Sequence, residues 1–169
     1  ILWLLAKCAL KTICVMALVL LQACPAGSPA RDSPAASHTA KADEYSNAID
    51  EFLQSYFSTW SDGDIDAYAA HFHPTATIKY IEDGQVVLSY GVSEFIDMQT
   101  RLMAGAKQQM HERMTSREVW VRDGVAWVGA NWELAQGSSI TRGVDHFVLM
   151  QAESGAWKIL SLVYYEHKD

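Results

Sequence analysis

Tyrosine, aspartate and histidine side chains are the groups in this 169-residue chain that could move a proton or hold an oxygen atom of a small molecule. Tyr56 and Tyr80 carry hydroxyls that donate hydrogen bonds, and Asp145 and His146 are candidate general bases. Asp145 and His146 are neighbours in a segment that alternates like a strand, so their side chains point to opposite faces and cannot pair directly. These four residues are candidates by side-chain type alone, and which of Asp145 and His146 faces the interior stays open.

The histidines do not form a metal-binding motif. His71 and His73 stand two residues apart at the expected end of a helix, where their side chains face different directions. No cysteine and no His-x-x-x-His spacing completes a site, so we expect no metal and no other cofactor. Aromatic residues suit a ligand with an apolar body, and Arg142 could receive an anionic group. The predicted ligand-binding residues are Tyr56, Trp60, Phe72, Tyr80, Trp120 and Arg142.

Hydrophobic periodicity predicts the elements that would position these groups. Over residues 43–60 apolar side chains recur every three or four positions, which is typical of a helix with one buried stripe. Asp64 is placed to cap a short second helix, in which Tyr68 faces the core and which must stop near His73 because Pro74 follows. A hairpin turning at Asp83-Gly84 and a third helix capped by Ser93, with Leu102 facing inward, come next. Alternating segments then predict four strands, over residues 109–122, 125–134, 140–151 and 156–167.

This order of elements, with local motifs over residues 56–78, resembles the nuclear transport factor 2-like superfamily, and within it the SnoaL-like proteins and the ketosteroid isomerases. Where the isomerases have Gly-Asp-x-Asp, then Phe, then Ala-Thr, this chain has Gly63-Asp64-Ile65-Asp66, Phe72 and Ala76-Thr77. The resemblance covers about residues 43–167, the whole domain. It implies an α+β cone, in which three N-terminal helices are wrapped by a curved, mostly antiparallel sheet.

The resemblance also implies roles for individual residues. In the isomerases the tyrosine matching Tyr56 stabilises an enolate oxygen, the base falls on Tyr80, and the second oxyanion-binding aspartate falls two positions from Asp145. A tyrosine with a pKa near 10 is a poor base, so steroid isomerisation is disfavoured. Scytalone dehydratase, in the same superfamily, implies instead a pair of tyrosines, Tyr56 and Tyr80, with His146 or His111 as the base. The SnoaL-like cyclases imply Asp145 as a lone base.

The N-terminal residues have the pattern of an export signal. Lys7 and Lys11 precede an apolar run over residues 12–21, which is shorter than the ~20 residues of a membrane span. Leu21-Gln22-Ala23-Cys24 resembles the lipobox of bacterial lipoproteins, which implies that Cys24 is lipidated. We predict a signal peptide over residues 1–23, a flexible Pro/Ala/Ser tether over 24–42 and a domain over 43–169. The expected location is the outer membrane of a bacterial envelope, with the domain in the periplasm.

Composition and charge narrow the possible partners. The chain has 13 Lys and Arg against 20 Asp and Glu, a net charge of −7 with no basic cluster, so nucleic-acid binding is not expected. The last predicted strand is apolar on both faces, which indicates a homodimer formed through the outer face of the sheet. We expect an exported domain that holds a small, largely apolar molecule in its cone. An isomerase, dehydratase or cyclase, and a protein-interaction module without a ligand, remain as alternatives.

Overall fold

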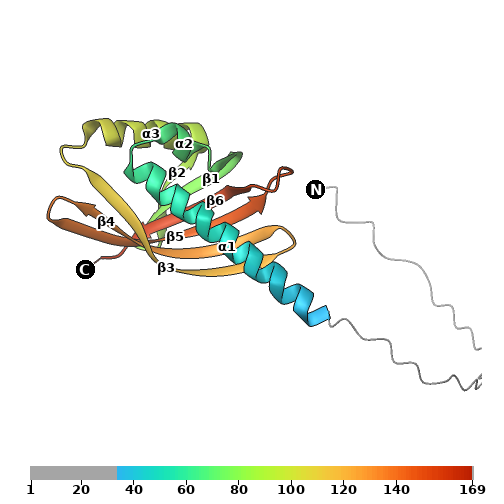
Figure 1. Ribbon diagram of the computed structural model, residues 1–169. Helices are drawn as coiled ribbons and strands as arrows, with labels where there is room; N and C mark the ends of the chain where they lie inside the picture. Colours follow the sequence, from blue (N-terminus) through green and yellow to red (C-terminus); the bar gives the residue numbers. More distant parts are fainter. Residues whose placement is uncertain (1–33, 169) are drawn as a thin grey trace, which may run out of the picture. The chain divides into compact units, whose positions relative to one another are not determined.

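The computed structural model describes residues 34–168, with side chains from residue 44 onward. The predicted signal peptide, Cys24 and the first part of the predicted tether lie outside the described residues. Three helices and six strands form the described part, in the order that the sequence predicts (Figure 1). These elements are α1 (Pro34–Ser61), α2 (Ile65–Ala69), β1 (Phe72–Glu82), β2 (Gln85–Gly91), α3 (Val92–Gly105), β3 (Met110–Arg122), β4 (Val125–Gln136), β5 (Ser139–Gln151) and β6 (Trp157–Glu166).

Helix α1 starts earlier than the sequence analysis predicts. It begins at Pro34 rather than near residue 43, so residues 34–42, which were predicted to belong to the tether, are helical. Proline is favourable in the first turn of a helix, and the alanines that follow have the highest helix propensity. No helix among the described residues combines the length and the apolar character that crossing a bilayer requires.

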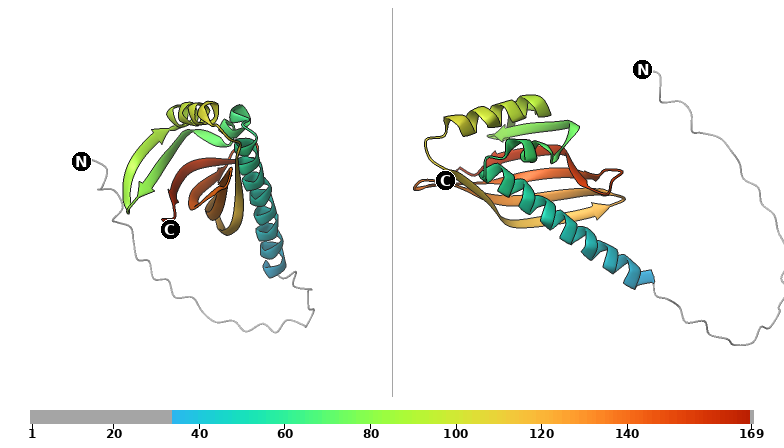
Figure 2. Two further views of the ribbon diagram at one scale, coloured as in Figure 1. Left: turned by 90° about the vertical axis from the view of Figure 1, so that its left-hand side faces the viewer. Right: turned by 45° about the horizontal axis from the view of Figure 1, so that its top comes forward.

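The sheet has the strand order β2-β1-β6-β5-β4-β3. The pair β1–β6 is parallel and every other neighbouring pair is antiparallel. The sheet curves strongly; α1 crosses one face of it, and α3 lies beside β1 and β2 (Figures 1 and 2). We call the face toward α1 the inner face and the opposite one the outer face. The predicted α+β architecture with a curved, mostly antiparallel sheet is confirmed.

Alternation along the strands decides which side chains reach the inner face. In β4 the even-numbered residues from Ala126 to Trp132 are buried, and Trp127 between them is exposed. In β3 the alternation changes, because Thr115 is an extra residue between the paired positions Met114 and Ser116. This β-bulge brings even-numbered residues inward before it and odd-numbered residues inward after it.

Short motifs in the connections behave largely as predicted. The Oδ1 atom of Asp64 accepts a hydrogen bond from the backbone N–H of Ala67 at 3.0 Å, which caps α2. Asp83 and Gly84 have φ of 50° and 73°, as a two-residue hairpin turn requires. Helix α2 is shorter than predicted, since β1 already begins at Phe72. Pro74 lies where the pairing of β1 with β6 is interrupted, so its missing N–H costs no ladder hydrogen bond.

Helix α3 differs from the prediction in its cap and in its inward residues. Its N-cap is Gly91 rather than Ser93, and the Glu94 carboxylate accepts a hydrogen bond from the Gly91 N–H at 3.5 Å. Leu102, expected to face inward, is 45% exposed. Gln99 is buried instead, and its side-chain oxygen accepts a hydrogen bond from Trp60 Nε1 at 2.8 Å. This bond satisfies two polar groups in the core and ties α1 to α3.

Candidate functional site

Two tyrosines form a buried hydrogen-bonded pair on the inner side of the fold. Tyr56 comes from α1 and Tyr68 from α2, and they are only 3% and 2% exposed. Their hydroxyl oxygens are 2.8 Å apart and their ring centroids 4.9 Å apart. The pair uses one of its two hydroxyl protons in this bond, and the described residues offer no further acceptor to the other. A donor is therefore left for a bound molecule.

Two carboxyl groups of the sheet also lie on its inner face. Asp145 of β5 is 5% exposed, and its Oδ1 atom accepts a hydrogen bond from Trp132 Nε1 at 2.9 Å. Glu112 of β3 has an inward side chain that is partly exposed. Its backbone N–H donates to the Ser61 hydroxyl at 2.8 Å, and that hydroxyl donates to the Glu112 carbonyl at 2.9 Å. The end of α1 is thereby fixed to β3 beside the site.

Burial dominates the electrostatics of these four groups. It raises the pKa of Asp145 from 3.8 to about 7, against the hydrogen bond from Trp132, which lowers it. Burial, followed by repulsion from Asp145, raises the pKa of Glu112 well above its usual range. Burial also raises the pKa of Tyr56 and Tyr68, and both carboxylates raise it further by repulsion. The tyrosines stay neutral, whereas Asp145 exchanges its proton close to neutral pH.

Aromatic rings surround this polar cluster. The ring of Tyr56 meets the ring of Phe147 at 5.2 Å in a T-shaped contact, and the ring of Tyr68 meets that of Phe72 at 5.5 Å. Tyr164 of β6, directly opposite Asp145 in the sheet, is half-buried, and its ring lies 6.3 Å from that of Phe95. A molecule at the cluster would therefore meet mostly apolar carbon surface.

A glycine makes the contact between Trp132 and Asp145 possible. A Cβ atom added to Gly143 would lie 2.2 Å from Trp132 Cζ2 and 2.3 Å from the carbonyl oxygen of Tyr165. Any larger residue would push the indole away from β5, and its N–H would move away from the carboxylate. Gly143 thus positions Trp132 and, through it, Asp145.

The structure places five of the predicted site residues on the inner side. Tyr56, Phe72 and Asp145 belong to the cluster and its aromatic surroundings, and Trp60 is buried farther along α1. Tyr80 is half-buried with its ring 5.1 Å from that of Tyr164. Tyr80 does not form the predicted pair with Tyr56.

Three predicted site residues lie on the outer face, where the prediction that they line the inner site is wrong. Trp120 is 58% exposed, because the bulge at Thr115 turns it outward. Arg142 and His146 are each an odd number of residues from the inward Asp145, so their side chains point outward. The sequence analysis separates Asp145 from His146 correctly but leaves open which of them faces inward.

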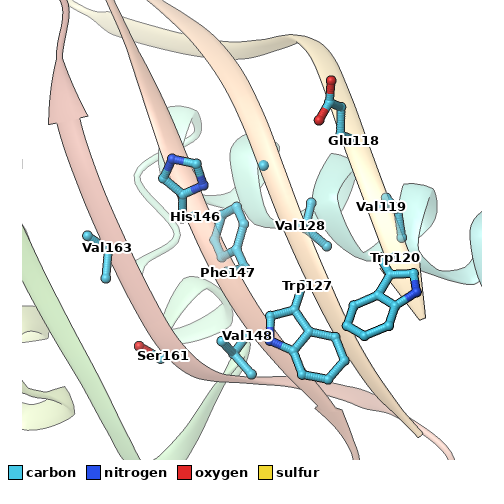
Figure 3. A pocket seen from close by; sticks show the side chains of 11 residues that line it. Glu118, Val119, Trp120, Trp127, Val128, His146, Phe147, Val148, Ser161 and Val163 are labelled. Carbon is cyan, nitrogen blue, oxygen red and sulfur yellow. The ribbon is translucent and has the colours of Figure 1, made fainter. Parts of the chain in front are cut away.

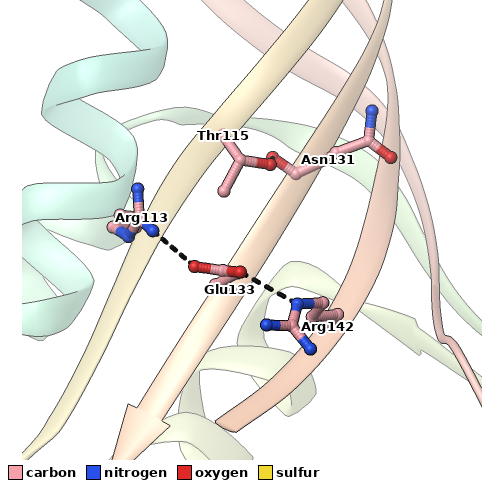
Figure 4. A network of polar contacts seen from close by, with 5 residues as sticks. All are labelled: Arg113, Thr115, Asn131, Glu133 and Arg142. Carbon is pink, nitrogen blue, oxygen red and sulfur yellow. Dashed lines mark hydrogen bonds and ion pairs between the residues drawn. The ribbon is translucent and has the colours of Figure 1, made fainter. Parts of the chain in front are cut away.

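Arg142 belongs to a surface ion-pair network. Its Nε atom donates to Glu133 Oε1 at 2.9 Å, and Arg113 binds the other oxygen of the same carboxylate (Figure 4). The hydrogen bond from Arg142 is the main cause that lowers the pKa of Glu133. Arg142 therefore has a partner within the protein and lies away from the tyrosine pair.

The outer face carries a shallow groove of about 440 Å³ (Figure 3). Trp120 and Trp127 lie side by side at one end with ring centroids 4.6 Å apart, and His146 and Val163 stand over the neighbouring strands. The described residues contain no group of three or more His, Cys, Asp or Glu side chains that could hold a metal ion.

Sequence reasoning missed Tyr68, Glu112 and Trp132 as members of the site. Tyr68 is predicted to face inward, but only as a core residue. No sequence pattern marks Glu112 as a site residue, because the residues of β3 that face inward cannot be identified until the position of the bulge is known. The role of Trp132 depends on a close approach to Gly143 across two strands, which no sequence pattern reports.

Comparison with known proteins identifies the family. A family model described as "Putative lumazine-binding" matches residues 44–165 of the chain. The chain belongs to this family. The match spans the described domain except its first ten residues and its last three. Comparison with curated proteins finds no match.

Solved structures of other proteins share the fold. A protein from Streptomyces avermitilis, described as a "putative dehydratase from the NTF2-like family", is 17% identical, with a TM-score of 0.62 over 75% of this chain and 99% of that one. An NTF2-like protein of unknown function from Silicibacter pomeroyi is 23% identical, with a TM-score of 0.57 over 75% and 98%. The β subunit of benzoate 1,2-dioxygenase from Burkholderia mallei is 17% identical, with a TM-score of 0.60 over 70% and 88%. These similarities establish the NTF2-like fold of this lumazine-binding family member.

Proposed function

We propose that the domain binds a small, largely apolar molecule on its inner face, with a polar atom of that molecule at the Tyr56–Tyr68 pair. The observation that carries the proposal is the unused hydroxyl proton of this buried pair. A buried donor without an acceptor is unfavourable, and a ligand oxygen or nitrogen would satisfy it. Aromatic walls with a few convergent polar groups are typical of small-molecule sites.

The family description supports a first choice of probe. Lumazine is a flat heterocycle with carbonyl oxygens, so it could stack on aromatic rings and accept the free tyrosine proton. Native and denaturing mass spectra of the purified chain would show whether a ligand co-purifies, and calorimetry would measure lumazine binding directly. A mass lost on denaturation, or a measurable Kd for lumazine, would support the proposal.

Removing one hydroxyl tests whether the pair makes the contact. Tyr68 donates to Tyr56, so the free proton is that of Tyr56, and we expect Tyr56→Phe to weaken binding about fivefold to tenfold, the equivalent of one hydrogen bond of about 1 kcal/mol. Tyr165→Phe on the outer row of β6 is the matched control, and it should leave the Kd unchanged. Equal binding by both variants would place the ligand elsewhere.

A proton-transfer enzyme of the isomerase, dehydratase or cyclase type is the second candidate. The specific observation in its favour is the pKa of about 7 for Asp145, which suits a general acid or base at neutral pH. The chain incubated with 2-tetralone in deuterated buffer would exchange the α-protons of this ketone faster than an Asp145→Asn variant does. Equal exchange rates would leave binding as the function.

We also propose that the chain is exported and anchored to a membrane through Cys24. The support is the lipobox-like Leu21-Gln22-Ala23-Cys24 after a short apolar run. Cell fractionation of the wild-type chain and of Cys24→Ser tests this proposal, since the variant should leave the membrane fraction. An unchanged distribution would show that Cys24 is not the anchor.

Self-association through the outer face is the remaining proposal. Trp120 and Trp127 are 58% and 41% exposed there, and large exposed apolar residues in one place are typical of contact surfaces. Sedimentation velocity at two concentrations would detect a homodimer. Trp127→Ser should shift such a dimer toward the monomer, whereas a monomer at all concentrations would refute the pairing.

A further inference from the structure

We infer that a second copy of the chain packs on the outer face, with the two-fold axis of the dimer parallel to β4 and passing over Gly129, so that Glu118 of each copy lies against His146 of the other. This inference rests on the self-association proposed above and specifies how the two copies meet. Its basis is the order of acid, glycine, base and tryptophan residues along two neighbouring rows of the outer groove.

One row of the groove places an acid and a base on opposite sides of a glycine. Gly129 of β4 is paired directly with Glu118 of β3 and with His146 of β5, and all three line the groove (Figure 3). Among the described residues the Glu118 carboxylate has no hydrogen-bond or ion-pair partner, and the His146 ring lies 5.9 Å from the Tyr165 ring without a hydrogen bond. Both groups can therefore bind a complementary group of another molecule.

The fold of a single chain does not require glycine at position 129. The φ of Gly129 is not positive, and an added Cβ atom would lie 3.6 Å from His146 Nδ1, an ordinary van der Waals contact. Apart from this imidazole ring, no other atom of the described residues outside the adjacent chain would come within 4 Å of it. Glycine inside a strand weakens the strand and often marks a place where another backbone approaches closely. At Gly129 that backbone would come from a second molecule.

The next row supplies the apolar part of the contact. Trp127 is paired directly with Trp120 of β3 and with Val148 of β5, and these three residues line the groove as well. The two indole rings lie against each other with centroids 4.6 Å apart, yet both remain largely exposed (Figure 3). Burial of this exposed apolar surface would favour association.

A two-fold axis parallel to β4 makes this face complementary to itself. The rotation exchanges the β3 side of one copy with the β5 side of the other, so Glu118 meets His146 at two symmetric places. It also brings the two Trp127 side chains together on the axis, and it places Trp120 of each copy over Val148 of the other. The two glycines then face each other, which lets the sheets approach.

An axis across the strands would be less favourable. It would place Glu118 on Glu118 and His146 on His146, so that like groups meet. The axis along β4 also keeps the strands of the two sheets within about 30° of each other, which is one of the common packings of two sheets. The ion-pair network around Glu133 lies four residues farther along β4, about 13 Å away, and Glu133 binds both arginines within its own chain.

A substitution of the glycine separates the contact from the fold. We expect Gly129→Val to raise the dissociation constant of the dimer roughly tenfold or more, because two added side chains would meet on the axis. The monomer should be at least as stable as wild type, because valine favours strands. Sedimentation velocity of the full chain over a concentration series gives the constant, and urea unfolding below that constant gives the stability. Thr77→Val, at an exposed position of β1, is the control and should change neither.

Exchanging the acid and the base tests the direction of the axis. Glu118→Arg and His146→Glu should each raise the dissociation constant roughly tenfold or more, because each removes the complementary contact at two symmetric places. The chain that carries both substitutions should recover most of the wild-type affinity, since Arg then meets Glu. An axis across the strands gives the opposite result, because Arg would meet Arg and Glu would meet Glu.

The outcomes separate this geometry from self-association itself. A wild-type chain that stays monomeric at all concentrations overturns both. A wild-type dimer that tolerates Gly129→Val, or that is weakened further in the double variant than in either single one, overturns the axis along β4 while self-association remains. Circular dichroism confirms that each variant folds, and if Gly129→Val does not fold, the charge exchange at the two exposed positions decides the question.

Discussion

Replacing Asp145 by asparagine should remove the pH dependence that this residue imposes on stability. The folded protein holds a proton on Asp145 up to about pH 7, whereas the unfolded chain releases it near pH 3.8. Over that interval the folded state binds more protons than the unfolded state, so the free energy of unfolding falls as pH rises. Asparagine cannot ionise, and its side-chain oxygen can still accept the Trp132 hydrogen bond.

The size of the effect follows from the difference between the pKa of Asp145 in the unfolded chain and its pKa in the folded protein. Each pKa unit is worth about 1.4 kcal/mol, so the shift costs the folded protein up to about 4 kcal/mol once Asp145 is ionised. Between pH 4.5 and 7.5 the variant should gain about 3 kcal/mol of stability relative to the wild type. Loss of repulsion on Glu112 acts in the same direction. Burial lowers the pKa of His71, but His71 is present in both proteins, so its contribution to the pH dependence largely cancels in the difference between them.

Urea unfolding followed by tryptophan fluorescence at pH 4.5, 6.0 and 7.5 measures this difference. An unsatisfied amide hydrogen on the introduced asparagine would shift every value by a constant, so the change with pH is the decisive quantity. Glu118→Gln, an exposed carboxyl on β3, should stay within about 0.5 kcal/mol of the wild type at each pH. A difference between Asp145→Asn and wild type that is the same at all three pH values would refute the burial argument.

Three further substitutions test other parts of the structure. Gly143→Ala should destabilise the fold by about 1–3 kcal/mol, because its Cβ would collide with Trp132; Gly105→Ala at the end of α3, where an added Cβ meets nothing within 4 Å, should be neutral or slightly stabilising in the same urea titration. Trp60→Ala should cost about 3–5 kcal/mol as a large-to-small change at a 5% exposed position, and a nearly unchanged melting temperature would contradict its place in the core. Cys24→Ser should move the protein from the membrane fraction to the soluble one, and immunoblots of both fractions would show it.

Local chemistry made the fold predictable from the sequence. The apolar stripe of α1, the Asp64 cap and the Asp83-Gly84 turn each depend on residues a few positions apart, so a local sequence pattern predicts them. The resemblance to the nuclear transport factor 2-like superfamily then supplied the order in which the elements pack. The sequence did not show which side of each strand faces α1.

The site was less predictable, because its members meet across elements. Tyr56 and Asp145 were recognised through the resemblance, and both lie in the cluster. Tyr68 was assigned to the core, although its hydroxyl is the partner of Tyr56. The prediction for Trp120 fails because of the extra residue in β3. The sequence alternates on both sides of Thr115, so it does not show that the inward positions change from even to odd numbers there.

The bulge at Thr115 decides which residue numbers of β3 face inward. A chain lacking this one residue would keep the pairs on both sides of it, Met114 with Trp132 and Ser116 with Asn131, and the strand would alternate without interruption. Trp120 would stay on the outer face, and Arg117 would stay inward beside Asp50. Homologues that lack the insertion should therefore show one unbroken alternation of apolar residues along this strand. An alignment of the family should place a gap at this position, since otherwise interior residues of one protein are matched to surface residues of another.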